Sequence, residues 1–114
     1  MTREQQDKSN KPIRRGHKRF YELLKVMEDI HDRKNDNYAK DSDPLSNLRM
    51  CQEFGVKPSL GTMVRMSDKW SRLVQLMNGK PDLVGENIKD TLLDLSIYCL
   101  LEHILLEEEE KTLR

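Results

Sequence analysis

The chain contains few aromatic residues: tryptophan, tyrosine and phenylalanine together make up 5% of its 114 residues. Strands are enriched in aromatic and β-branched side chains, whereas the six methionines present here suit a helical core. Net charge is also missing, because twenty basic and twenty acidic residues cancel. No overall field therefore favours a long nucleic acid or an acidic membrane surface as a partner.

Cysteines and long apolar runs are equally scarce. Cys51 and Cys99 are the two cysteines, and both fall within helical patterns, which indicates reduced core residues of a cytosolic protein rather than a disulfide. No apolar run approaches the roughly 20 residues that span a bilayer, and the polar N-terminus has no hydrophobic signal core. We expect a soluble, cytoplasmic protein without a membrane partner.

The length predicts one domain with a single modest core. Residues 1–12 show no apolar period and are predicted to form a flexible arm. Residues 13–110 are predicted to form one all-α domain, and residues 111–114 a C-terminal tail. Four helical patterns follow one another, and no strand-like alternation of any length interrupts them.

The first predicted helix runs from Ile13 or His17 to about Asn35, and a loop follows over residues 35–44. Its apolar stripe comprises Phe20, Leu23, Leu24, Met27 and Ile30. Asp43 and Pro44 then indicate an N-cap and a first helical residue. The short helix that they open is predicted to point Leu45, Leu48, Cys51 and Phe54 inward and to stop at Gly55.

The third predicted helix runs from Ser59 to Asn78 and Gly79, which form its stop. Its predicted core face comprises Met63, Met66, Trp70, Leu73, Val74 and Met77. The last helix is predicted from about Leu83 to about Glu108, roughly 26 residues or about 39 Å. The glutamates at 107–110 are expected to form a solvated helix end.

This last helix is apolar on two sides. One side carries Ile88, Leu92, Leu95, Cys99 and Leu106, and the other carries Leu93, Ile97, Leu100, Leu101 and Ile104. A single small bundle rarely buries both sides of its final helix. We therefore expect a homo-oligomer in which one side meets a second subunit.

Carboxylates interrupt the same helix. Glu86, Asp90 and Asp94 follow one another at intervals of four residues, with Tyr98 next, so a helix would stack them along one ridge. Asp90 and Asp94 fall on an apolar side, where an ionised carboxylate needs a cation or hydrogen-bond donors. One interpretation is a Mg²⁺ or Mn²⁺ site with oxygen ligands. The other is a helix cap at Glu86, an ion pair at Asp90 and a hydrogen-bonded Asp94.

The third helix offers a cationic complement. Arg65, Lys69 and Arg72 are spaced by four and three residues, with Asp68 among them. The simpler interpretation is a solvated face with an Asp68–Arg72 pair. The alternative is a phosphate-binding cluster in which the arginines grip oxygens bidentately.

The end of the first helix is the third candidate. Lys34 continues its apolar stripe, an unusual place for charge unless the side chain reaches out to water. Asn35, Asn37 and Tyr38 follow directly and offer amide groups and an aromatic ring suited to a base or sugar. A role in ligand contact is as plausible here as a solvated helix end.

Four segments in order resemble a phage and bacterial family called nucleotide modification associated domain. They are residues 34–38 (KNDNY), 43–47 (DPLSN), 64–73 (VRMSDKWSRL) and 86–98 (ENIKDTLLDLSIY). That family is in turn similar to the MazG-type all-α nucleotide pyrophosphohydrolases. The resemblance implies a four-helix, bundle-like subunit that holds Mg²⁺ on paired acidic motifs and cleaves a nucleoside triphosphate.

Carried over by position, the resemblance implies catalytic and metal-binding roles for Glu86, Asp90 and Asp94. The implied nucleotide-binding residues are Lys34, Asn35, Asn37, Tyr38, Arg65, Asp68, Lys69, Arg72 and Tyr98. The family's acidic pairs are incomplete, because Asn87 stands where a glutamate is expected. Two functions follow as hypotheses: a Mg²⁺-dependent nucleotide pyrophosphohydrolase, or an oligomeric protein that binds a nucleotide without cleaving it.

Overall fold

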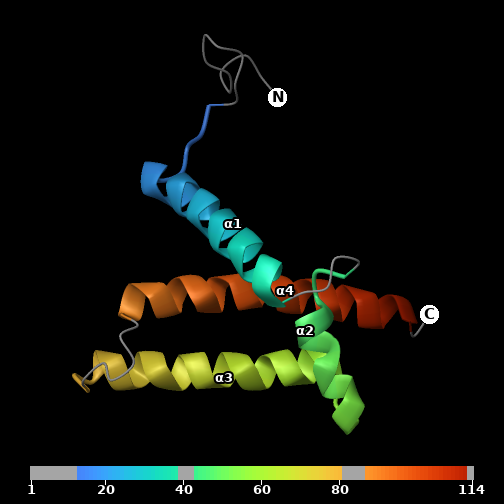
Figure 1. Cartoon of the computed structure of the whole chain (residues 1–114). Helices are drawn as coiled ribbons and strands as arrows, with labels where there is room; N and C mark the ends of the chain where they lie inside the picture. Colours follow the sequence, from blue (N-terminus) through green and yellow to red (C-terminus); the bar gives the residue numbers. More distant parts are fainter. Residues whose placement is uncertain (1–12, 39–42, 81–86, 113–114) are drawn as a thin grey trace. The chain divides into compact units, whose positions relative to one another are not determined.

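A computed structural model describes residues 13–38, 43–80 and 87–112, and this part of the chain is helical without a strand. In order it contains α1 (Lys18–Tyr38), α2 (Ser46–Arg49), the short 3₁₀ helix η2 (Met50–Phe54), α3 (Pro58–Met77) and α4 (Ile88–Thr112) (Figure 1). The all-α prediction is confirmed. The predicted arm at residues 1–12 lies outside the described residues.

The chain divides into two compact units, Met1–Asp32 and Arg33–Arg114. In the first, His17 Nδ1 accepts a hydrogen bond of 3.0 Å from the backbone N–H of Arg19 and so caps the first turn of α1. The Tyr21 hydroxyl accepts a bond of 2.9 Å from the N–H of Gly16. The Arg14 guanidinium lies 4.6 Å from the centroid of the Tyr21 ring. These contacts tie the segment before α1 to its first turn.

α1 continues to Tyr38, so the prediction of a loop from Asn35 was wrong for its first residues. Asparagine and aspartate cost at most about 0.7 kcal/mol per residue relative to alanine in a helix interior. Each residue added to an existing helix gains a backbone hydrogen bond. A helix that is already formed can therefore extend through these polar residues.

Asp43 forms a turn before α2 rather than the helix cap that the sequence predicted. Its Oδ1 accepts a bond of 3.0 Å from the N–H of Leu45, and its carbonyl oxygen accepts one of 3.1 Å from the N–H of Ser46. The N-cap position is Leu45, without a side-chain cap bond. The prediction of Pro44 as the first helical residue was wrong because this turn precedes the helix.

The short helical segment α2–η2 buries fewer residues than predicted. Leu45 and Leu48 are 7% and 3% exposed, Cys51 is half-buried, and Phe54 is 82% exposed. Phe54 is the last residue of η2, which projects past the start of α3 (Figure 1). Gly55, with φ 75°, then reverses the chain toward α3. Phe54 therefore lies beyond the packed part of the segment, and its predicted burial was wrong.

α3 and α4 lie side by side in opposite directions (Figure 1). The stop predicted for α3 is confirmed: Asn78 is its C-cap, and Gly79 has φ 79°. The N–H groups of Gly79 and Lys80 bond to the carbonyls of Leu76 and Gln75 at 3.1 Å. α4 begins at Ile88, with Asn87 directly before it, and it continues to Thr112, four residues past the predicted end. The predicted start near Leu83 lies outside the described residues.

The seam between α3 and α4 is largely polar. The buried residues of the two helices are Pro58, Ser59, Thr62 and Leu73 on α3 and Thr91, Glu102 and Leu105 on α4. The predicted core face of α3 is confirmed for Leu73, which is 6% exposed, and Met66 is half-buried. It was wrong for Val74, Met63, Trp70 and Met77, which are 46%, 53%, 62% and 75% exposed. Bonds from Ser59 to Glu109 and from Lys69 to Asp94 align α4 with the polar stripe of α3, which turns the apolar stripe outward.

A small apolar cluster covers one end of this hairpin. Leu45 and Leu48 pack there with Leu105, and Tyr98 and Leu101 lie against them. Both cysteines are free, but Cys99 is exposed rather than in the core. No helix in the described ranges has the length and apolarity needed to cross a bilayer.

Candidate functional site

Asp94 receives hydrogen bonds from two lysines. Lys34 Nζ donates to its Oδ1 at 2.9 Å, and Lys69 Nζ donates to its Oδ2 at 3.2 Å. The Asp94 side chain is 15% exposed, so most of its surface has been removed from water. The cationic neighbour expected beside this buried carboxylate is therefore present, and it consists of two ammonium groups.

Three elements bring this cluster together. Lys34 lies in the last turns of α1, Lys69 in the middle of α3, and Asp94 in the second turn of α4. Lys69 belongs to the polar stripe of α3 that faces α4, three residues after Met66 and four before the buried Leu73. A long, flexible lysine stem can follow the seam and deliver its charge to the Asp94 carboxylate.

The cluster carries one carboxylate and two ammonium groups, a net charge of one positive unit. The Lys34 and Lys69 side chains remain 46% and 26% exposed. Lysine ammonium groups act as point charges with three donors each, which suits them to bind an anion. An approaching phosphate would meet positive charge already in position.

The expected metal ligands do not gather in the described part of the chain. Asp90 is exposed, so its predicted place on an apolar, buried face was wrong; α4 turns that residue toward solvent at its first turn. Its N–H donates to Asn87 Oδ1 at 2.9 Å. Glu86 lies outside the described residues. Among residues 13–38, 43–80 and 87–112, no group of three histidine, cysteine, aspartate or glutamate side chains could hold a metal ion.

The predicted phosphate cluster on α3 divides between two places. Lys69 turns toward Asp94, whereas Arg65 is exposed and lines a cavity of about 500 Å³ beside α2–η2. Asp68 is exposed and Arg72 is half-buried. Residues three apart on a helix differ in direction by about 300°, and residues four apart by about 400°. The side chains of Arg65, Asp68, Lys69 and Arg72 therefore do not all point the same way.

The residues predicted to contact the base or sugar are only partly described by the structure. Asn35 is half-buried on α1, whereas the side chains of Asn37 and Tyr38 lie outside the described residues. Tyr98 is half-buried and packs on the cluster of Leu45, Leu48 and Leu105. Its position favours a packing role over ligand contact.

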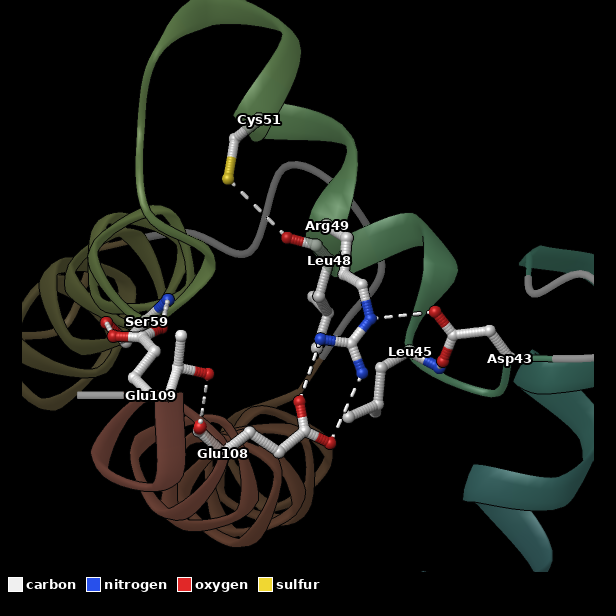
Figure 2. Close-up of polar contacts among 9 residues, drawn as sticks. Asp43, Leu45, Leu48, Arg49, Cys51, Ser59, Glu108 and Glu109 are labelled. Atoms are coloured by element: carbon white, nitrogen blue, oxygen red, sulfur yellow. Dashed lines mark hydrogen bonds and ion pairs between the residues drawn. The ribbon is translucent and has the colours of Figure 1, made fainter. Parts of the chain in front are cut away.

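A second charged cluster was not predicted. Arg49 donates from Nε to Asp43 at 2.7 Å and from Nη1 and Nη2 to the two oxygens of Glu108 at 2.8 and 3.3 Å (Figure 2). The Arg49 hydrogen bond, with help from the N–H of Leu45, holds the pKa of Asp43 below its usual value. The two carboxylates raise the pKa of Arg49.

Glu109, next to Glu108, bonds the first turn of α3. Its Oε1 accepts a hydrogen bond of 2.6 Å from Ser59 Oγ, and its Oε2 accepts one of 3.2 Å from the Ser59 N–H (Figure 2). The prediction that the glutamates at 107–110 form a solvated end was therefore wrong for two of them. Arg49 and Ser59 lie 59 and 50 residues from these glutamates in the sequence, and the packing of α4 against α2 and α3 brings them into reach.

Glu102 is the most buried ionisable residue in the described seam. It is 6% exposed, and neither carboxyl oxygen has a hydrogen-bond partner among the described residues. Thr62 is 1% exposed, and its hydroxyl also has no hydrogen-bond partner among the described residues. Burial, and secondly the carboxylate of Glu109, raise the pKa of Glu102. The sequence carried a signal for this residue, since Glu102 lies four residues after Tyr98 and three before Leu105, both inward.

Comparison of the sequence with protein-family models and with curated proteins, and of the fold with solved structures, gives no match.

Proposed function

We propose that this protein binds a nucleotide through its phosphates at the Lys34–Asp94–Lys69 cluster. The observation that supports the proposal is the convergence of two ammonium groups from α1 and α3 on one partly buried carboxylate of α4. Asp94 holds the lysines in place, and their partly exposed side chains present positive charge to the ligand. Preorganised cations of this kind bind phosphate without first rearranging.

A nucleotide fits this cluster better than free phosphate because of the residues around it. Asn35 follows Lys34 directly, and its amide can hydrogen-bond a base or sugar. Arg72 lies one turn beyond Lys69 on α3 and supplies a further cation for an adjacent phosphate. The resemblance of residues 34–38 and 64–73 to the nucleotide modification associated domain points to the same ligand class.

Hydrolysis is the second candidate, and the exposed Asp90 favours it. Mg²⁺ is commonly bound by one or two carboxylates together with substrate phosphates, and Asp90, one turn before Asp94, is accessible for that role. Asp94 fits a metal less well, because both of its oxygens accept bonds from lysines. The described residues alone do not compose a complete Mg²⁺ site.

One experiment separates the two candidates. Purified protein is incubated with a panel of ribo- and deoxynucleoside triphosphates, with and without Mg²⁺, and both bound ligand and products are quantified. Binding that survives a chelator, without products, supports a protein that sequesters or senses a nucleotide. Product formation that depends on Mg²⁺ and is abolished in Asp90→Asn supports a pyrophosphohydrolase. Absence of both binding and turnover across the panel contradicts the proposal.

We further propose that the chain works as a homo-oligomer. The outward stripe of α3 and the facing side of α4 expose Trp70, Val74, Met77 and Leu92, which also line an apolar groove with Leu73 and Ile88. Contiguous apolar surface of this kind is typical of protein–protein contacts. Light scattering of the wild type and of Trp70→Glu tests this proposal, which predicts a smaller species for the variant.

A further inference from the structure

The seam between α3 and α4 contains an acid that the proposed nucleotide site does not use. Glu102 lies between Asp94 and Glu109 along α4, and Thr62 lies between Ser59 and Lys69 along α3. The bonds Lys69–Asp94 and Ser59–Glu109 join the helices on either side of them. Thr62 and Glu102 therefore occupy the same stretch of the seam, and both are buried.

No cation in the described residues serves the Glu102 carboxylate. Lys34 and Lys69 bond to Asp94, Arg49 bonds to Asp43 and Glu108, and His103 bonds to Glu107. Arg72, a further half-buried cation of α3, lies ten residues along that helix from Thr62. Glu109, on the same face of α4, adds negative charge, which further disfavours an ionised Glu102. Tyr98, one turn earlier, packs in the leucine cluster.

The carboxyl oxygens of Glu102 are also closed to larger ligands. Each is sealed from solvent and has no hydrogen-bond partner among the described residues. An ionised carboxylate in such a place costs several kcal/mol unless a charge or donors compensate it. A proton removes the charge, needs no additional space and turns one carboxyl oxygen into a donor.

We propose that Glu102 is a proton-binding residue, neutral in the folded hairpin, whose bound proton keeps the seam between α3 and α4 closed. The proton comes from solvent as the helices pack. Release of the proton opens the same seam that holds Lys69 against Asp94.

The proposal predicts the sign of the pH dependence. Glu102 has its ordinary pKa of 4.5 when unfolded and a raised pKa when folded. Between these two values the folded chain binds one more proton than the unfolded chain. Stability therefore falls as the pH rises from about 4.5 through the folded pKa of Glu102, and the proton's contribution is lost above it.

The test compares Glu102→Gln, which imitates the neutral acid, with Glu110→Gln, an exposed acid on the same helix. Urea unfolding midpoints are measured at about pH 5 and about pH 8. We expect the wild type and Glu110→Gln to lose stability at the higher pH, and Glu102→Gln to lose less and to exceed the wild type there. Equal pH dependence in Glu102→Gln and the wild type would overturn the proposal.

A spectroscopic measurement does not depend on whether the variant folds. Infrared spectra of the wild type are recorded at neutral pH, where ordinary carboxyl groups are ionised. The carbonyl stretch of a protonated carboxylic acid should persist in the folded protein and vanish on unfolding in urea. Its absence from the folded protein would show that Glu102 is ionised, which contradicts the proposal.

Discussion

Lys69 on α3 and Asp94 on α4 are joined by a hydrogen bond of 3.2 Å between Nζ and Oδ2, and Lys34 of α1 bonds the other oxygen of the same carboxylate at 2.9 Å. One aspartate therefore organises cations from two other helices. Both the stability of the second unit and the proposed phosphate site depend on it. This double contact distinguishes Asp94 from Asp90, one turn earlier, which is exposed.

Replacement of Asp94 by asparagine keeps the shape of the side chain and removes its charge. The two lysines then lose their common acceptor in a partly buried place. Because hydrogen bonds to charged groups are worth about 1.5–3 kcal/mol, we expect Asp94→Asn to lower the free energy of unfolding by about 2 kcal/mol in urea titrations. The matched control is Asp90→Asn, with an expected change within about 0.5 kcal/mol. Equal effects of the two substitutions would remove the distinction between these aspartates.

Arg49 connects α2 to the end of α4 through Glu108 and anchors the turn at Asp43 (Figure 2). Arg49→Ala removes all three hydrogen bonds, and we expect it to cost about 1–2 kcal/mol, allowing for the partial exposure of the acids. Arg19→Ala is the control, since its pair with Glu22 has side chains 60% and 47% exposed. That substitution should change the unfolding free energy by less than about 0.5 kcal/mol. A loss at Arg49 no larger than at Arg19 would show that the cluster does not hold α2.

Low pH should weaken the ion pair between Arg49 and Asp43. Arg49 holds the pKa of Asp43 below 3.8, so the contribution of the Asp43 carboxylate to stability is present above that value and is lost as the pH falls through the lowered pKa. Stability of the wild type should therefore exceed that of Asp43→Asn at neutral pH, and the difference should shrink in strong acid. Urea titrations of both proteins over this range provide the measurement. A difference that stays constant into strong acid would contradict the assigned ion pair.

Gly61 in α3 faces Cys51 of η2 closely enough to exclude a side chain. A Cβ added at Gly61 would lie 2.7 Å from Cys51 Sγ and 3.3 Å from its Cβ. Alanine normally favours a helix over glycine by about 1 kcal/mol, but overpacking at this contact should cost about 1–3 kcal/mol. We expect Gly61→Ala to destabilise the wild type and to be neutral or stabilising when Cys51→Ala is also present. Thermal unfolding of the four proteins of this double-mutant cycle measures the coupling.

Independence of the two substitutions would mean that η2 and α3 are not in contact there. The cycle has a further use, because Cys51 Sγ otherwise makes only long contacts with the carbonyls of Leu48 and Lys57, at 3.5 and 3.7 Å. Cys51→Ala alone should therefore reduce stability only slightly, so the double variant should still fold.

Local signals in the sequence predicted the helices better than their packing. The stop of α3 follows from Asn78 and Gly79, because a positive φ after the last turn suits glycine. The extension of α1 to Tyr38 was missed, because propensities that disfavour asparagine are smaller than the gain from continuing a helix. The predicted start of the last helix, near Leu83, lies outside the described residues.

The inward faces could not be predicted because periodicity does not identify what a stripe packs against. The apolar stripe of α3 through Met63, Trp70 and Met77 was expected inside, yet α4 packs on the polar stripe through Ser59, Thr62 and Lys69. Long-range polar partners decide this orientation. Pairs such as Arg49–Glu108 join residues 59 apart, which no local pattern reveals.

The candidate site was predicted in part for the same reason. A carboxylate within an apolar helix indicated a cationic neighbour, and Asp94 has two. The same pattern predicted that Asp90 points the same way as Asp94. Residues four apart on a helix differ in direction by about 400°, however, which is about 40° more than one full turn. Near the N-terminus of α4 that difference is enough to turn Asp90 toward solvent.

The most direct test of the account is a calorimetric titration of nucleoside triphosphates into three proteins: the wild type, Lys69→Met and Lys89→Met. Lys89 is an exposed lysine on α4 without a part in the cluster. The account predicts binding to the wild type, at least about tenfold weaker binding to Lys69→Met, which is about 1.4 kcal/mol, and unchanged binding to Lys89→Met. Equal affinity of all three proteins, or no binding of any nucleotide to the wild type, would contradict it.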